Sequence, residues 1–177
     1  MGVVNPLTRE QAAPEVQEVF DKIAERTGKV PNMFAAMAHR PDVLKAFLPL
    51  YKMIINQGTV EAKYKELAYL RASMVNGCEY CTRAHSASSK RAGVTAEQIA
   101  ALPFYKRSPL FDEKEKATIL HADRVTRAAT TIRAAELEDL RKFYDEGQIV
   151  ELTLAVCMAN FTNRFNDALE NIPDLGV

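Results

Sequence analysis

Residues 66–85 read ELAYLRASMVNGCEYCTRAH, and this stretch decides how the rest of the chain is interpreted. Cys78 and Cys81 form a C-x-x-C pair, and His85 follows the second cysteine by four positions. On one helix these positions fall at i, i+3 and i+7, so the three side chains share a face. A C-x-x-C pair closes readily into a disulfide, and its thiols become more acidic near a helix N-terminus. The stretch therefore predicts a reactive dithiol with a histidine beside it.

A carboxylate completes this arrangement from the preceding helix. The Asn-Gly pair at 76–77 is a chain-reversal signal, so one helix should end there and a second should begin near Cys78. Short connections favour antiparallel helices. At a rise of about 1.5 Å per residue, Glu66 and His85 then lie level, roughly 12 to 15 Å below the turn, with Cys81 one turn above. The spacing makes a Glu66–His85–Cys81 proton relay geometrically plausible, in which the carboxylate orients a histidine that takes the thiol proton.

The pattern of a Glu, eleven residues, C-x-x-C, three residues and a His resembles a known family. It is similar to that of the alkylhydroperoxidase D-like branch of the carboxymuconolactone decarboxylase superfamily, and RASMVNGCEYC at 71–81 looks like its peroxidase-related members. The resemblance covers about twenty residues and matches four chemically meaningful positions. It implies the all-helical fold of that family, a thiol-dependent peroxidase activity and a homo-oligomer, either a trimer or a hexamer.

The resemblance also implies a catalytic cycle. Cys81 attacks the O–O bond of hydrogen peroxide or an alkyl hydroperoxide and becomes a sulfenic acid. Cys78 condenses with it to give a disulfide, which an external dithiol or a disulfide reductase then reduces. The nearness of His85 also favours Cys81 as the attacking thiol. The opposite order stays open, because Cys78 lies closer to the helix N-terminus.

Tyr80 stands between the two cysteines and has two interpretations. Its ring packs in the interior, or its hydroxyl lines the substrate pocket beside the thiols. Some family members carry at this position a histidine that takes part in the proton relay, and Tyr80 departs from that pattern. The departure weakens the case for a second relay onto Cys78.

The bulk properties exclude several classes of protein. A length of 177 residues suits one domain, over 1–177, with enough chain to bury a core. Lys plus Arg and Asp plus Glu both number 23, which removes the electrostatic case for nucleic-acid binding. No apolar run is long enough to cross a membrane, and the first residues have no signal-peptide pattern. Three cysteines, two of them in C-x-x-C, suggest redox chemistry in a reducing compartment, so we expect a cytoplasmic protein.

The fold class follows from the absence of any strand-like alternation, which predicts an all-α chain. Thr8 should open the first helix with a capping box, and Thr59 should cap the helix that carries Glu66. The last helix is apolar almost all round, which predicts that it is buried and that Cys157 is an inert core thiol. We expect helices over 8–26, 31–39, 41–56, 59–76, 78–92, 95–102, 112–128, 134–146 and 149–170.

Two alternatives to a peroxidase stay open. A zinc site could use Cys78, Cys81, His85 and Glu66, but structural zinc sites usually draw ligands from two loops, and three ligands on one helix face crowd one side of a tetrahedron. We therefore predict neither a metal nor a cofactor, although a non-enzymatic thiol switch or zinc protein remains an alternative. The other alternative is a lactone decarboxylase of the same fold, against which the dithiol argues because that chemistry needs acid–base groups.

Overall fold

Helices make up the regular structure in the computed structural model, which describes residues 2–174 except for the side chain of Glu136. No β-strand occurs within residues 2–174, so the all-α prediction is confirmed. The helices are α1 (Pro14–Thr27), α2 (Asn32–Met37), α3 (Pro41–Asn56), α4 (Ala62–Asn76), α5 (Glu79–Arg91), α6 (Ala96–Ala101), α7 (Glu113–Ala128), α8 (Glu138–Arg141) and α9 (Glu146–Ala168), with 3-10 turns η1 (Leu102–Phe104), η2 (Ala129–Thr131) and η3 (Ala134–Leu137).

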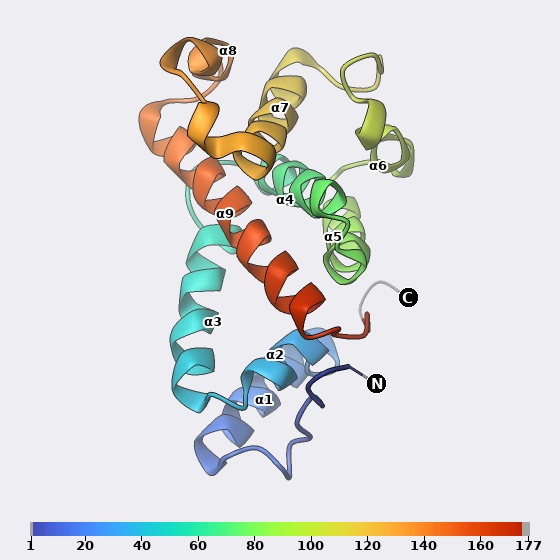
Figure 1. The fold of residues 1–177 in the computed structure, drawn as a ribbon, viewed down its shortest axis with the longest axis vertical. Helices are drawn as coiled ribbons and strands as arrows, with labels where there is room; N and C mark the ends of the chain where they lie inside the picture. The colour runs from blue at the N-terminus through green and yellow to red at the C-terminus, as the bar shows by residue number, and fades with distance from the viewer. Residues whose placement is uncertain (1, 175–177) are drawn as a thin grey trace.

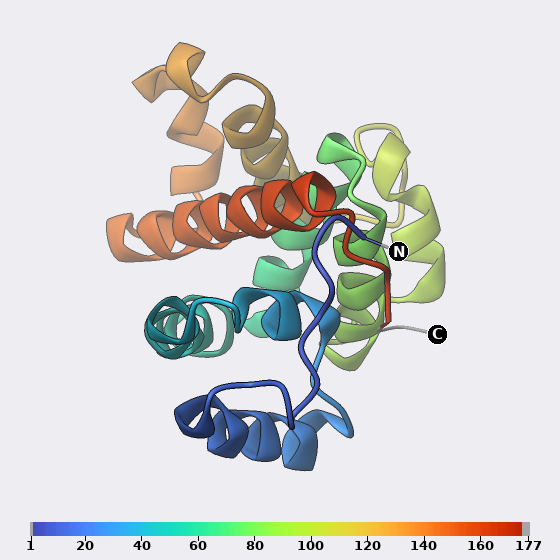
Figure 2. The same cartoon turned by 60° about the horizontal axis from the view of Figure 1, so that its bottom comes forward.

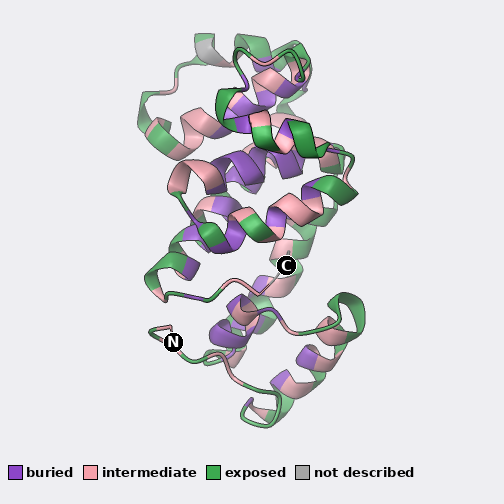
Figure 3. Ribbon diagram, turned by 90° about the vertical axis from the view of Figure 1, so that its right-hand side faces the viewer, coloured by how far each residue is buried: buried purple, intermediate pink, exposed green. Residues whose placement is uncertain are grey.

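The helix α4 is the centre of the molecule and packs against α5, α7 and α9 (Figure 1). All nine residues of α4 from 65 to 73 are buried, so this helix has no solvent face over two turns. The burial map agrees, with buried residues concentrated along the middle of the bundle and exposed residues on the outer helices and loops (Figure 3). A charged residue on α4 therefore needs a partner inside the protein.

The two ends of the molecule are built from different parts of the chain. The helices α1 and α2 lie at one end with the N-terminal turn of α3, and α6 to α8 lie at the other (Figure 1). The long helix α9 runs beside both α4 and α3, as the tilted view makes clear (Figure 2). Its C-terminal half comes close to the start of α5, where Asn166 contacts Cys81 across 85 residues of sequence.

Several helix boundaries agree with the sequence signals. Pro41 occupies the first turn of α3, where its missing N–H costs no hydrogen bond. Gly77 ends α4 with a φ of 74°, a left-handed conformation that glycine adopts without a steric penalty. Capping boxes at Thr95 and Asp112 start α6 and α7 as predicted.

Two predicted helix starts are wrong. The backbone N–H of Thr8 does donate to Gln11, at 2.9 Å, but this closes only a turn, and α1 begins at Pro14. The helix α4 begins at Ala62 after Glu61, while Thr59 hydrogen-bonds Glu151 of α9. In both cases a local capping pattern was satisfied by a turn or by a distant carboxylate instead of by a helix.

The predicted helix over 134–146 is also wrong. The 3-10 turn η3 and the four-residue helix α8 occupy this region. Asp145 caps α9 through a capping box with Gln148, so Gly147 lies in the first turn of α9 and does not end the preceding helix. The capping signal at 145–148 therefore decides the boundary.

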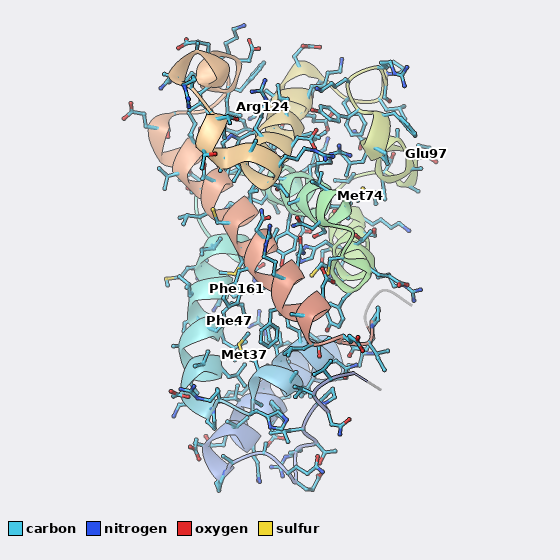
Figure 4. The ribbon with its side chains drawn as sticks, viewed as in Figure 1. Met37, Phe47, Met74, Glu97, Arg124 and Phe161 are labelled. Atoms are coloured by element: carbon cyan, nitrogen blue, oxygen red, sulfur yellow. The ribbon has the colours of Figure 1, made fainter. Side chains whose placement is uncertain are left out.

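The prediction that α9 is buried all round is wrong. Val150, Leu154, Cys157 and Phe161 lie along one exposed face of the helix, which we call the α9 face. Cys157 is therefore an exposed thiol and not a core residue. Phe161 also stacks on Phe47 of α3, with ring centroids 5.5 Å apart (Figure 4). Within residues 2–174, no helix combines the length and apolar character that crossing a bilayer requires.

Candidate active site

The α4–α5 turn places both cysteines at the start of a helix. After Gly77, Cys78 is the N-cap residue of α5, and its sulfur accepts a hydrogen bond from the backbone N–H of Cys81 at 3.5 Å. Both thiols are buried and free. The register of α5 then puts His85 one turn below Cys81, on the face that packs against α4.

Glu66 and His85 form a buried hydrogen-bonded pair, as their spacing predicted. His85 Nδ1 lies 2.8 Å from Glu66 Oε2, and the two residues are 6% and 9% exposed. Because an ionised carboxylate only accepts hydrogen bonds, Nδ1 carries the hydrogen and Nε2 is the nitrogen that exchanges a proton with other groups. Glu66 therefore fixes both the orientation and the tautomer of the imidazole.

Two tyrosines complete the surroundings of His85. The ring of Tyr69 stacks on the imidazole, with centroids 3.5 Å apart and planes inclined by 17°. The hydroxyl of Tyr51 lies 3.4 Å from His85 Nε2, and burial raises the pKa of that phenol well above its ordinary value. At neutral pH Tyr51 is therefore a protonated hydroxyl that can donate to Nε2 and accept a proton in exchange.

The Cys81 sulfur receives a hydrogen bond from a distant part of the chain. Asn166 Nδ2 donates to it at 3.2 Å, while Asn171 Nδ2 donates to Asn166 Oδ1 at 2.9 Å. An amide whose oxygen accepts a hydrogen bond must turn its NH₂ group the other way. Asn171 therefore holds Asn166 with its donor toward the sulfur.

The two thiols differ in acidity. A hydrogen bond from Cys78, followed by those from Asn166 and Asn163 and by the charge of His85, lowers the pKa of the Cys81 thiol to about 6 against the opposing effect of burial. The hydrogen bond that Cys78 gives to Cys81, together with burial, raises the pKa of the Cys78 thiol well above its ordinary value. Cys81 is therefore the thiol that ionises first.

The structure changes one link of the predicted relay. Among the described residues Glu66 contacts His85 directly, but no hydrogen bond joins His85 to Cys81; instead Nε2 faces the hydroxyl of Tyr51. The influence of His85 on the Cys81 thiol is electrostatic. Proton transfer between these two side chains therefore needs Tyr51, a substrate oxygen or a water between them.

Tyr80 fits both of its interpretations in part. Its hydroxyl donates to Asp174 Oδ1 at 2.8 Å and accepts from the backbone N–H of Met33 at 3.2 Å. The residue also lines the cavity beside the thiols. Tyr80 therefore holds the C-terminal segment against the start of α2 while its side chain forms part of the cavity wall.

A cavity of about 560 Å³ opens beside these residues. Its inner wall includes Cys81, His85, Glu66, Tyr51 and Tyr69. A ligand can therefore meet the acidic thiol and the Glu66–His85 pair at the same time.

Comparison with known proteins gives consistent results. The sequence pattern of the carboxymuconolactone decarboxylase family matches residues 41–124, which include all five predicted site residues. A peroxidase-related protein from Silicibacter sp. TM1040 has the same fold, with a TM-score of 0.85, 26% identity and coverage of 96% of this chain and 92% of its own. A second, described as an alkylhydroperoxidase AhpD core from Ralstonia eutropha JMP134, has a TM-score of 0.86 at 21% identity, with 98% and 92% coverage. Residues 41–124 therefore match the carboxymuconolactone decarboxylase family, and nearly the whole chain has the fold of these alkylhydroperoxidase D-like proteins.

Proteins with this fold differ in what they do. The debrominase Bmp8 is similar to this chain at a TM-score of 0.83 and 25% identity, covering 98% of this chain and 92% of that protein. Peroxidase-related proteins, a decarboxylase family and a debrominase therefore share the fold. The shared fold establishes the architecture, while the reaction has to be argued from the site.

The described side chains of the site are not arranged as the ligands of a metal ion would be. Across residues 2–174, no three His, Cys, Asp or Glu side chains converge as they would around a metal ion. The side chains that the zinc alternative requires are used otherwise, since Glu66 binds His85 and Cys78 binds Cys81. This geometry does not favour the zinc interpretation.

Three site residues were missed at the sequence level. Tyr69 follows Glu66 by three positions, so helix periodicity could have placed it beside the same face. Tyr51 and Asn166 lie 34 and 85 residues from their partners His85 and Cys81. No local pattern signals either of them, because tertiary packing alone brings them to the site.

Proposed function

We propose that this protein is a thiol-dependent peroxidase that reduces hydrogen peroxide or alkyl hydroperoxides through the Cys78–Cys81 pair. The observation that supports this most directly is the Cys81 sulfur itself. It is acidified by hydrogen bonds from Cys78 and Asn166, and it lines a cavity that also contains the Glu66–His85 pair. A peroxide needs a thiolate and a proton donor for its leaving oxygen, and this cavity offers both.

The first step oxidises Cys81. Its thiolate attacks the nearer oxygen of the O–O bond, an S–O bond forms and the O–O bond breaks. Cys81 leaves this step as a sulfenic acid, and the departing oxygen becomes an alcohol, or water when hydrogen peroxide is the substrate. The low pKa keeps most of Cys81 as thiolate at neutral pH.

The leaving oxygen takes its proton from the histidine side of the cavity. His85 Nε2 and the Tyr51 hydroxyl form a donor pair that Glu66 orients from behind. Either the Tyr51 hydroxyl or His85 Nε2 can donate its proton to the alkoxide as it leaves. The stacked ring of Tyr69 restricts rotation of the imidazole, so the donor stays directed into the cavity.

The second step closes the disulfide. The Cys78 thiol attacks the sulfenic sulfur of Cys81, an S–S bond forms and water leaves. The N-cap geometry already brings the two side chains into contact, so no large movement is needed. An external dithiol, or a disulfide reductase, then reduces the disulfide and is itself oxidised.

The remaining features of the proposal follow from this cycle. A dithiol that must be re-reduced suits a reducing compartment, so we propose a cytoplasmic location. The exposed apolar α9 face supports the homo-oligomer, trimer or hexamer, that the resemblance implies. Sedimentation of the purified protein measures the assembly, and a monomer at micromolar concentration would contradict it.

The test is peroxide consumption with a dithiol reductant. Wild type should turn over, Cys81→Ser should be inactive, Cys78→Ser should stall after one oxidation, and Glu66→Gln should be slow. If the wild type and both cysteine variants are equally inactive, the proposal is wrong, and a lactone substrate and bound metal should be tested next.

A second candidate is reductive dehalogenation of a ring-sized organic halide. Two observations favour it, namely the cavity volume of about 560 Å³ and the likeness to the debrominase Bmp8. In that reaction a carbon–halogen bond is replaced by carbon–hydrogen, halide leaves, and the two thiols are oxidised to the disulfide. Halide release from a brominated pyrrole under anaerobic conditions, without peroxide turnover, would select this reaction.

A further inference from the structure

A second cavity adjoins the thiol cavity. A space of about 430 Å³ is lined mainly by residues of α1 and α3, two helices that contact each other. Its lining shares with the thiol cavity Arg26, Thr27, Phe34, Tyr51 and Asn56. The two cavities therefore adjoin each other, and we call them together the substrate groove.

The size of the groove exceeds what hydrogen peroxide needs. A water molecule occupies about 30 Å³ in the liquid, and hydrogen peroxide has only one more heavy atom. Sites that bind organic ligands span about 300 to 1,000 Å³, and the thiol cavity alone lies within that range. The groove is therefore large enough to hold an organic molecule.

The walls of the groove are largely apolar. Phe34 and Tyr51 lie where the two cavities meet, and their rings contact each other edge to face with centroids 6.2 Å apart. Further apolar side chains line it on either side, namely Ile23, Met33, Leu48 and Ile55. Such walls stabilise a bound hydrocarbon chain or ring by removing it from water.

The rim of the groove carries four exposed cations, Lys22, Arg26, Lys52 and Arg91, which we call the cationic rim. None of the four forms an ion pair with a carboxylate of the described residues, and Arg91 instead donates to the Ser88 hydroxyl at 2.8 Å. Among the described lining residues Glu66 is the one carboxylate, and it lies deep in the cavity, bound to His85. The rim therefore presents cationic side chains that have no ion-pair partner among the described residues, next to apolar walls.

We propose that the substrate groove selects an amphipathic organic anion, in the catalytic cycle a hydroperoxide that carries a carboxylate at the far end of an apolar chain or ring. The hydroperoxide reaches Cys81, the apolar part lies along the walls at Phe34 and Tyr51, and the carboxylate meets Arg26 and Arg91. Guanidinium groups bind carboxylates through paired hydrogen bonds, which neutral alcohols cannot reproduce. The hydroperoxide part of this inference rests on the proposed peroxidase function, whereas the preference for an anion does not.

Equilibrium binding tests the anion preference without any turnover. Octanoate and octanol share one chain and differ in charge, so calorimetric titration of reduced protein with each isolates the carboxylate. Wild type should bind octanoate about tenfold more tightly than octanol at low salt. The double variant Arg26→Gln/Arg91→Gln should lose most of that difference and keep its affinity for octanol. Equal binding of the two ligands by wild type would overturn the inference.

A matched control separates the rim from the overall charge. Arg83 and Arg107 are exposed and do not line the groove, so Arg83→Gln/Arg107→Gln removes the same charge elsewhere. This control should bind both ligands as wild type does. If it loses octanoate binding as strongly as the rim variant, net charge explains the effect and the cationic rim does not.

Kinetics with matched hydroperoxides then connects the groove to catalysis. The terminal hydroperoxide of octanoate should have a KM about tenfold below that of octyl hydroperoxide at similar kcat, and the rim variant should raise that KM while leaving kcat unchanged. Turnover of both substrates with equal KM would contradict the inference and leave the peroxidase proposal standing. Preferential octanoate binding without any hydroperoxide turnover would support the anion preference and contradict the peroxidase proposal.

Discussion

The structure places Asn166 beside the Cys81 sulfur, a role that no sequence pattern indicated. Its amide donates to the Cys81 sulfur at 3.2 Å, and Asn171 fixes the orientation of that amide. Replacing Asn166 by Leu keeps a side chain of similar size and removes the donor. The lost hydrogen bond stabilises the Cys81 thiolate more than the neutral thiol, so the pKa of Cys81 should rise.

The magnitude follows from the strength of a hydrogen bond to a charged acceptor. Such a bond contributes about 1.5 to 3 kcal/mol, and one pKa unit corresponds to about 1.4 kcal/mol, so the pKa should rise by about one to two units. Starting from about 6 in the wild type, it should reach about 7 to 8 in Asn166→Leu. At pH 6 the thiolate fraction then falls from about half to about a tenth or less.

The assay is the pH dependence of alkylation of Cys81 by iodoacetamide, followed by intact mass. The exposed Cys157 would also react, so every variant is made in a Cys157→Ser background. Thr162→Val is the matched control, because Thr162 Oγ1 lies 3.9 Å from the same sulfur and should change the pKa by less than about half a unit. Asn171→Ala should give an intermediate shift by releasing the Asn166 amide. If Asn166→Leu is folded, by thermal unfolding, and alkylates with the wild-type profile, the reasoning is refuted.

Two further predictions concern proton transfer and stability. Tyr51→Phe removes the hydroxyl beside His85 Nε2 and should lower kcat for hydroperoxide about tenfold to a hundredfold, with the alkylation pKa of Cys81 unchanged; a wild-type kcat would exclude Tyr51 from proton transfer. Burial opposes ionisation of Glu151, but hydrogen bonds from the backbone of Thr59 and Val60, and from the Thr59 and Lys65 side chains, lower its pKa to about 2. Glu151→Gln should therefore reduce the free energy of unfolding by about 2 kcal/mol at pH 7. Because the folded-state pKa lies below the unfolded one, this contribution is complete above about pH 4.5 and declines toward pH 2, so urea unfolding should show a smaller difference at about pH 3 than at pH 7. A difference that does not depend on pH would show that the carboxylate charge is not involved.

The sequence could predict those parts of the site that depend on one turn between two helices. Gly77 ends α4 and reverses the chain. With α4 and α5 antiparallel, the helical rise on either side of the turn then brings Glu66 level with His85. The acidity of Cys81 could be anticipated in direction, because a C-x-x-C pair at a helix start favours it. Its largest cause, the hydrogen bond from Cys78, is equally local.

Other parts depended on packing that no local pattern encodes. The apolar residues of α9 look alike in sequence, but α4 covers one side of the helix and leaves the α9 face exposed. Hydropathy reports the chemistry of a side chain and not which neighbour covers it. The same limit hid Asn166, whose polar side chain in a buried helix position has meaning only beside the Cys81 sulfur.

The most direct test of the central claim is to identify the first oxidised sulfur in a single turnover. Reduced protein in the Cys157→Ser background is mixed with one equivalent of an organic hydroperoxide, quenched with dimedone and analysed by intact mass and peptide mapping. The account predicts a Cys78–Cys81 disulfide in the wild type, a dimedone adduct on Cys81 in Cys78→Ser, and no oxidation in Cys81→Ser. A dimedone adduct on Cys78 in Cys81→Ser, formed as fast as wild-type oxidation, would contradict the assignment of Cys81 as the attacking thiol.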